Sequence, residues 1–162
     1  MNNITMIAAV GKNLELGRKN DLIWRFKEDM TFFREQTMGK PMVMGYNTFK
    51  SLPKVLPGRK HIVLCFEKVD LGEDVDVVTS MDELLDKINE YPEVMIIGGA
   101  SIYQQMIDYS NKLILTEVDA EAKDADVYFP KFNKTEWTKK VLSEEEEDNI
   151  KFKHLVYTRK NK

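Results

Sequence analysis

The chain has 162 residues, of which 43% are apolar and 31% charged, and its 24 basic and 27 acidic side chains leave a net charge of −3. This apolar content excludes a disordered chain, and the acidic balance argues against broad nucleic-acid binding. Cys65 is the only cysteine, which excludes an internal disulfide framework, and two histidines argue against a His-rich metal site. The longest apolar runs, such as residues 6–10, are too short to span a bilayer or to form a signal-peptide core. The sequence therefore predicts a single soluble, cytoplasmic domain over residues 1–162.

Strand-like apolar runs alternate with helix-like segments through most of the chain. Residues 4–10 are almost continuously apolar, which is typical of a buried strand. Residues 11–24 have no clean period and predict a long loop, a feature that is often functional in compact domains. The next predicted elements are a helix at 27–37, a strand at 42–44, a short helix at 47–51 with Asn47 as its N-cap, a turn at 56–59, and strands at 61–66 and 75–79.

The clearest predicted helix follows Ser80, which fits a capping box with Glu83. Apolar residues then repeat at helical spacing, at Met81, Leu84, Leu85 and Ile88. Further elements are predicted as a strand at 94–97, a helix at 100–107, a strand at 112–118, and two strands at 137–142 and 151–158. The link at 143–149 contains an acidic run at 144–148 that is typical of a solvated loop. This order predicts an α/β fold with a mainly parallel sheet covered on both faces and a C-terminal antiparallel hairpin at one edge.

Asp29 is the first candidate for chemistry. On the predicted helix, Phe26, Met30 and Phe33 form an apolar stripe, and Asp29 lies at its edge. The residue has two interpretations. It is either a first-turn aspartate favoured by the helix dipole, or a buried carboxylate with a perturbed pKa that binds a cationic or amidine-like ligand group.

Two strand-to-helix turns are candidates for anion binding. Gly98-Gly99 and the segment 45–48 each place glycine where a helix begins, so that backbone N–H groups could approach a phosphate. A lone Gly-Gly is more often a tight turn, and the presence of two such turns favours an anion site. Arg59 follows Pro57-Gly58 and is either a carboxylate or phosphate ligand or a surface residue. Trp24 fits a core or a pocket, and Cys65 fits an inert core position.

In combination, these features resemble the dihydrofolate reductase family in its bacterial chromosomal form. The matching pieces occur in the order and at the spacing of the family and cover nearly the whole chain, fading after Trp137. They are Ile7-Ala8-Ala9; Gly17, Leu22 and Trp24; Asp29 and Phe33; residues 37–41; Met44-Gly45 and Thr48; residues 51–53 and 56–59; Ile62-Val63-Leu64; residues 96–100 with Ile102-Tyr103; Leu115-Thr116; Phe129-Pro130; and Trp137.

The resemblance implies an eight-stranded, mostly parallel sheet flanked by four helices, and NADPH-dependent reduction of 7,8-dihydrofolate to tetrahydrofolate, which serves one-carbon metabolism. It implies that Asp29 binds the pterin 2-amino group and N3 and promotes protonation of N5, while the cofactor delivers hydride to C6. Thr116 would support Asp29 by a hydrogen bond, and Arg59 would bind the α-carboxylate of the glutamate tail. Residues 11–24, with Leu22 and Trp24, would form a mobile loop over the nicotinamide. A cis peptide would join Gly98 and Gly99.

The resemblance also implies two sets of binding residues. Those for the substrate are Ile7, Ala8, Ala9, Leu22, Met30, Phe33, Thr48, Leu52, Leu56, Arg59, Ile97 and Tyr103. Those for the cofactor are Ala9, Leu16, Gly17, Gly45, Tyr46, Asn47, Thr48, Leu64, Cys65, Phe66, Ile97, Gly98, Gly99, Ala100, Ser101, Ile102 and Tyr103. No metal is implied. The expected partners are dihydrofolate and antifolate inhibitors, with no nucleic acid or membrane, and the expected state is a monomer.

The sequence departs from the family at several positions. Tyr46, Phe66 and Ser101 occupy positions where the family often has basic or hydroxyl residues that contact the 2′-phosphate of NADPH. This predicts weakened preference for NADPH over NADH, unless Lys50 or Lys68 replaces the contact. Ile23 and Lys27 replace prolines that flank Trp24, which should loosen the entry to the Asp29 helix. An extra residue in 122–125 precedes Asp126, so the contact to the mobile loop could differ.

Two other functions remain open at this point. A reductase of the same fold could act on a pyrimidine intermediate of riboflavin synthesis, although Asp29 and Arg59 favour folate. A non-catalytic pterin- or nucleotide-binding module is the second, and the joint presence of Asp29, Trp24, Thr116 and Gly98-Gly99 argues against it.

Overall fold

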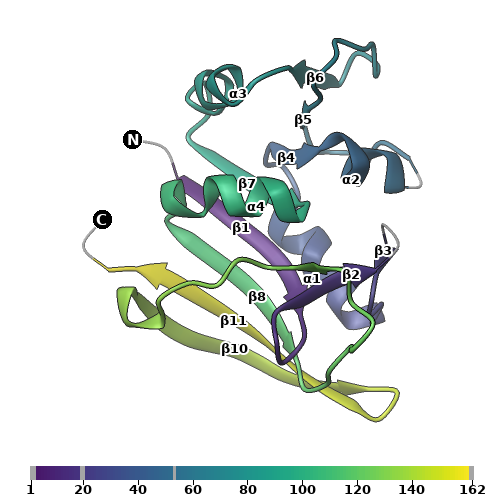
Figure 1. The fold of residues 1–162 in the computed structure, drawn as a ribbon, viewed down its shortest axis with the longest axis vertical. Coiled ribbons are helices and arrows are strands. Elements are labelled where there is room, and N and C mark those ends of the chain that lie inside the picture. The colour runs from purple at the N-terminus through teal and green to yellow at the C-terminus, as the bar shows by residue number, and fades with distance from the viewer. Residues whose placement is uncertain (1–2, 19–20, 53, 161–162) are drawn as a thin grey trace.

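The computed structural model describes residues 3–18, 21–52 and 54–160; Pro53 of the 51–53 motif lies outside these ranges. Its largest sheet has eight strands (Figure 1). They are β1 (Asn3–Val10), β4 (Met42–Gly45), β5 (His61–Leu64), β6 (Val75–Val78), β7 (Glu93–Gly98), β8 (Lys112–Val118), β10 (Trp137–Glu147) and β11 (Ile150–Arg159). Their order across the sheet is β10-β11-β8-β1-β7-β4-β5-β6.

The strand directions confirm the predicted mostly parallel sheet. β8, β1, β7, β4, β5 and β6 pair in parallel. β11 runs antiparallel to both β8 and β10, so the C-terminal hairpin closes one edge as predicted. In the parallel strands, side chains are buried on both faces, and Met42, Val43, Ile62 and Val63 have no exposed surface.

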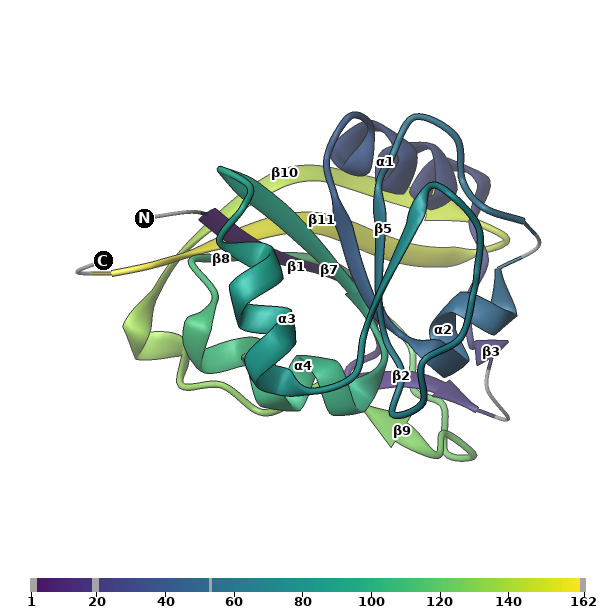
Figure 2. The same cartoon turned by 90° about the horizontal axis from the view of Figure 1, so that it is seen from above.

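Helices cover both faces of the sheet (Figures 1 and 2). They are α1 (Lys27–Thr37), α2 (Tyr46–Ser51), α3 (Met81–Ile88) and α4 (Ala100–Met106), with short 3₁₀ turns η1 (Ile107–Tyr109) and η2 (Lys134–Glu136). Alternation along the strands separates the two layers. Met6 packs in the cluster that contains the α3 and α4 side chains, while Ile7 packs with Phe32 and Phe33 of α1 on the other face. No helix in the described part of the chain is long and apolar enough to cross a membrane.

The predicted capping box of α3 is present with one difference. Ser80 Oγ accepts a hydrogen bond from Glu83 N at 3.1 Å, as expected for an N-cap. The Glu83 carboxylate accepts from Thr79 N at 2.8 Å, one residue before the cap. At α2 the prediction was wrong: Gly45 is the N-cap, and Asn47 lies inside the helix.

The prediction of one irregular loop over residues 11–24 was also wrong. This segment contains β2 (Glu15–Arg18) and β3 (Asp21–Leu22), which form a three-stranded sheet of order β3-β2-β9 with β9 (Val127–Tyr128). β9 lies far along the chain from β2. The periodicity of residues 11–24 therefore gives no sign that β2 is a paired strand. Asp126, which directly follows the segment with the extra residue, donates its N–H to Gly17 O at 3.0 Å and so still contacts this region.

The C-terminal hairpin is longer than predicted. Residues 144–147 belong to β10 and do not form a solvated loop, and only Asp148 and Asn149 make the turn. Both turn residues have positive φ, 54° and 65°, the conformation that tight hairpins need and that Asp and Asn tolerate. Glu144 and Glu146 lie opposite Lys153 and Lys151, which offsets the repulsion within the acidic run. β5 ends at Leu64, so the predicted strand at 61–66 was two residues too long, and Phe66 lies beyond the observed strand.

Candidate active site

A row of three residues crosses the sheet beneath the first turn of α1. Ala9 of β1 pairs with Thr116 of β8, and Thr116 pairs with His154 of β11. Asp29 reaches this row from α1, and Thr116 Oγ1 donates a hydrogen bond to Asp29 Oδ1 at 2.5 Å. The predicted contact between Asp29 and Thr116 is therefore present in the structure.

The surroundings of Asp29 change how it titrates. Burial raises the pKa of Asp29, and the negative charges of Glu28 and Glu147 raise it further, while the Thr116 hydrogen bond and His154 oppose the rise. The side chain keeps 18% of its surface exposed, and within the described ranges no residue donates a hydrogen bond to Oδ2. Asp29 thus holds its proton to higher pH than an ordinary aspartate and keeps one oxygen for a ligand, which favours the functional interpretation.

Apolar side chains gather on the face of the sheet that α1 covers. Phe33 and Ile97 pack against two clusters: one contains Ile7, and the other includes Leu52 and Leu56 among its partly buried members. Leu22 and Met30 are 54% and 58% exposed, unusually high for large apolar residues. Phe33 and Ile97 thus connect the cluster of Ile7 with that of Leu52 and Leu56, and their binding of substrate stays a prediction.

Arg59 is held by its own turn. Its Nε donates to Pro57 O and its Nη1 to Thr37 Oγ1, both at 3.1 Å. Nη2 forms no hydrogen bond with any residue that the structure describes. The buried ring of His61 fixes the turn, because Nδ1 donates to Arg59 O at 3.0 Å and Nε2 accepts from Leu56 N at 3.1 Å. Burial, followed by the charge of Arg34, lowers the pKa of Arg59. Arg59 is therefore an anchored cation with one free nitrogen.

The two glycine turns lie next to each other, because Met44 of β4 pairs with Gly98 of β7. The peptide between Gly98 and Gly99 is cis, as predicted. A Cβ on Gly99 would lie 3.2 Å from Thr48 Oγ1, and one on Gly45 would lie 3.5 Å from the Ile102 side chain. No side chain caps α2 or α4 at its start. Backbone N–H groups are therefore left for another acceptor on an open glycine surface.

Comparison with known proteins decides the family. The dihydrofolate reductase family model matches residues 3–159. The dihydrofolate reductase of Neisseria gonorrhoeae is 36% identical over 159 residues, covering 98% of this chain and 96% of that protein. The Bacillus subtilis dihydrofolate reductase is 33% identical, with 98% and 95% covered. A solved Enterococcus faecalis dihydrofolate reductase, complexed with NADP(H) and RAB-propyl, superposes with a TM-score of 0.87 at 26% identity and covers 98% of this chain and 97% of that one.

The chain belongs to the dihydrofolate reductase family. Enzymes of this family are oxidoreductases that reduce dihydrofolate with NADPH, and this reductase shares their fold, activity and cofactor.

Several predicted cofactor residues of the reductase are core residues. Leu64, Cys65 and Ile102 are buried, and the buried Tyr103 donates its hydroxyl to Ile7 O at 2.7 Å. Burial also raises the pKa of Tyr103, so this phenol keeps its proton. Asn47 and Ser101 are exposed, and Phe66 is 88% exposed. A ligand at the end of β5 would therefore contact mainly backbone atoms and the exposed side chain of Phe66.

The predicted mobile loop is anchored at its start. A Cβ on Gly11 would meet the Trp24 ring at 2.6 Å and Glu15 Oε1 at 2.5 Å, so both side chains depend on glycine there. The carboxylate of the buried Glu15 accepts from Asn13 N at 2.7 Å and Ala122 N at 2.8 Å. Burial alone would raise the pKa of Glu15, but the Ala122 and Asn13 hydrogen bonds lower it. Leu16 and Gly17 belong to β2 in this anchored part, and Leu22 to β3.

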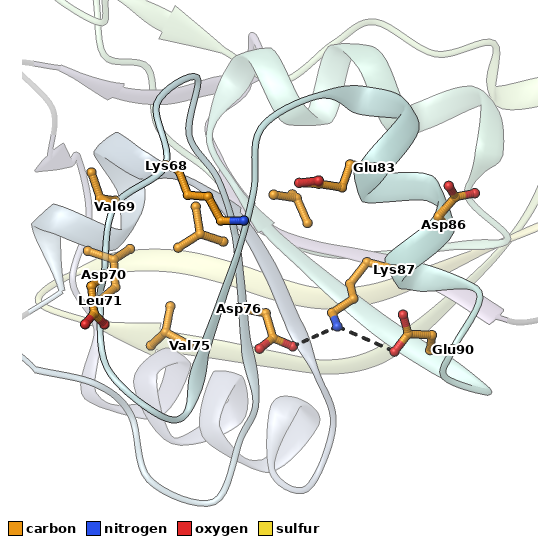
Figure 3. A pocket seen from close by; sticks show the side chains of 12 residues that line it. Lys68, Val69, Asp70, Leu71, Val75, Asp76, Glu83, Asp86, Lys87 and Glu90 are labelled. Carbon is orange, nitrogen blue, oxygen red and sulfur yellow. Dashed lines mark hydrogen bonds and ion pairs between the residues drawn. The ribbon is translucent and has the colours of Figure 1, made fainter.

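A separate groove of about 660 Å³ lies beside the edge strand β6. Figure 3 shows Lys68 on one side of it and Lys87 on the other, where Lys87 pairs with Asp76 at 3.2 Å and Glu90 at 3.5 Å. Apart from Lys68, its lining shares no residue with the predicted site. Lys68 thus lies in a mainly acidic groove. Lys50, the other candidate for the 2′-phosphate contact, has its Nζ 4.9 Å from the centre of the Tyr46 ring.

Four residues of the site were missed from the sequence: Glu28, His61, Glu147 and His154. A histidine on an apolar strand is ordinarily read as core. Only the alternation that places His154 on the same inward face as Phe152 marks it as a buried polar group.

Proposed function

We propose that Asp29 is the proton-handling group with which this chain reduces 7,8-dihydrofolate to tetrahydrofolate. The single observation that supports this role most strongly is its geometry: a largely buried carboxyl group, held by Thr116 at 2.5 Å, whose Oδ2 accepts no hydrogen bond from any described residue. The pterin 2-amino group and N3 are a donor set that matches the two oxygens of one carboxylate. A raised pKa favours the protonated form, which promotes protonation of pterin N5.

The apolar residues and Arg59 bind the remainder of the substrate. Ala8, Ala9, Met30, Phe33, Leu52, Leu56 and Ile97 contact the pterin and the ring that follows it, and exclude water from Asp29. Arg59, already fixed by Pro57 and Thr37, uses Nη2 for the α-carboxylate of the glutamate tail. The same residues receive antifolate inhibitors.

The cofactor fits the turns at Gly45 and Gly98-Gly99. Uncapped helix starts provide N–H groups for a pyrophosphate, and the glycines let its oxygens approach the backbone. Thr48, Ala100 and Ser101 lie at these helix starts, and exposed Phe66 offers a face for the adenine. NADPH supplies the hydride that reduces pterin C6. Leu22 and Trp24 shield this region from solvent.

The decisive test replaces Asp29. We expect Asp29→Asn to reduce dihydrofolate-dependent oxidation of NADPH at neutral pH by at least about 100-fold, because general acid–base groups contribute on that order. The exposed Asp108→Asn variant is the control and keeps full turnover. Near-normal turnover in a folded Asp29→Asn variant would reject the role of Asp29.

We further propose that the chain acts as a single-domain monomer in the cytoplasm. Support for the single domain comes from the one family model that matches residues 3–159. Sedimentation of the purified chain at micromolar concentration is expected to give a monomer, and a dimer would contradict it.

A further inference from the structure

His154 and Glu28 form a second hydrogen-bonded pair next to Thr116. His154, only 1% exposed, places Nδ1 3.0 Å from Thr116 Oγ1 and Nε2 2.5 Å from Glu28 Oε1. Its ring stacks on Phe32 with centroids 3.8 Å apart and meets the edge of Phe152. The result is a continuous chain of hydrogen bonds, from Asp29 through Thr116 and His154 to Glu28.

The chemistry of these groups limits the direction of each bond. A hydroxyl has one proton, so when Thr116 donates to ionised Asp29 it must accept from His154, and Nδ1 must carry a hydrogen. Nε2 and Glu28 Oε1 then need a proton between them, because two lone pairs at 2.5 Å would repel. With Nδ1 protonated, that shared proton places positive charge on the imidazole whenever Glu28 is ionised.

The charged groups around this row of hydrogen bonds come from three elements. Glu28 and Asp29 face it from α1, His154 from β11, and Glu147 from β10, while β8 contributes the neutral Thr116. His154 Nδ1 lies 3.7 Å from Asp29 Oδ1, close enough for its charge to act on the carboxylate directly. The Glu28 side chain is 42% exposed, so the row of hydrogen bonds ends at solvent.

We propose that His154, held by Glu28, is a positioning residue: it orients the Thr116 hydroxyl toward Asp29 and supplies the positive charge that stabilises the ionised carboxylate. Without the Nδ1 hydrogen, the Thr116 hydroxyl is equally able to accept from a protonated Asp29, so the preference for the ionised form is lost. This inference rests on the proposed role of Asp29 for its effect on turnover.

Two substitutions separate charge from orientation. His154→Phe keeps an aromatic ring against Phe32 and removes both nitrogens. His154→Asn keeps an N–H donor at the place of Nδ1 but carries no charge. Lys153→Ala is the matched control. It lies on the exposed face of the same strand and removes one positive charge without changing any hydrogen bond between Asp29 and Glu28.

The first readout is the titration of the Asp29 carboxyl carbon by ¹³C nuclear magnetic resonance, assigned with Asp29→Asn. We expect the midpoint to rise by about one pH unit in His154→Phe, by less in His154→Asn, and not at all in Lys153→Ala. The second readout is the single-turnover rate of dihydrofolate reduction. This rate falls as Asp29 loses its proton, so its decline moves to higher pH by the same amount.

An unchanged or lowered midpoint in folded His154→Phe would overturn the proposal and leave His154 a packing residue. If His154→Phe does not fold, the same criterion applies to His154→Asn, because loss of charge alone raises the midpoint. A shifted carboxyl titration together with near-normal turnover of Asp29→Asn would retain this inference and reject the proposed role of Asp29.

Discussion

Tyr46 combines a departure from the family with a local compensation. It begins α2 beside the glycine turn, and Lys50 lies one helical turn later with its ammonium over the ring. Lys50 therefore brings positive charge to the place where the family often has arginine. Lys68 is less suited, because it lines a groove rich in carboxylates.

This arrangement predicts the cofactor preference. Tyr46→Arg should increase the ratio of kcat/KM for NADPH to that for NADH by about tenfold or more, since a charge-assisted hydrogen bond contributes roughly 1.5–3 kcal/mol. Lys50→Ala should decrease the same ratio, and Lys68→Ala should leave it unchanged. The measurement is the steady-state rate with each cofactor at fixed dihydrofolate. A ratio that does not rise in Tyr46→Arg would show that this side chain does not face the 2′-phosphate.

At the scale of elements, the start of α1 depends on a distant hairpin. Phe26 caps the helix without a side-chain hydrogen bond. The Glu147 carboxylate of β10 accepts instead from Lys27 N at 3.0 Å and from Glu28 N at 3.5 Å. Phe26 also stacks on Phe152 of β11 with centroids 4.4 Å apart. The hairpin thus holds the helix that carries Asp29, at the point where Ile23 and Lys27 replace the prolines of the family.

Glu147→Ala should therefore destabilise the folded chain by about 1 kcal/mol, the usual cost of losing an N-cap. Glu146→Ala is the control, because it makes the same change at the neighbouring exposed strand position. The free energy of unfolding in urea, measured for both variants, tests the difference. Equal stability of the two would mean that the Glu147 contact contributes nothing to α1.

The elements that sequence reasoning identified are those with local signals. The capping box at Ser80 and the apolar spacing that follows it are enough for α3, and Asp29 was found because it lies at the edge of an apolar stripe. β2, β3 and the far half of β10 were missed because their stability comes from pairing with strands elsewhere in the chain. His154 was missed for the same reason: its role exists only once β8, β11 and α1 are assembled.

At the scale of the whole molecule, two anionic ligands must bind to a chain of net charge −3. Long-range electrostatic attraction between the protein and its ligands therefore does not assist this binding. We therefore expect affinity to come from a few placed groups, namely Arg59, the backbone N–H groups at the two glycine turns and Lys50. Arg59 and the backbone groups are held by the fold before any ligand arrives, which limits the entropy lost on binding.

The buried carboxyl group of the site also affects the stability of the whole molecule. Because burial raises the pKa of Asp29 in the folded protein, the folded chain binds more protons than the unfolded chain between the two pKa values. Stability therefore falls as pH rises through this range, by about 1.4 kcal/mol for each unit of the pKa rise. Asp29→Asn removes the charge while keeping the shape. It should be more stable than the original chain near about pH 7, and the gain should disappear below the ordinary aspartate range, about pH 3.5.

Urea unfolding of both proteins at the two pH values measures this effect, with Asp108→Asn as the control. The expected result is opposite in sign to the effect on turnover: the variant that loses activity gains stability. That opposition excludes unfolding as the cause of lost activity. An Asp29→Asn protein less stable than the original at neutral pH would instead show that the ionised carboxylate is stabilised by its neighbours. Thr116 and His154 would then outweigh burial and the charges of Glu28 and Glu147.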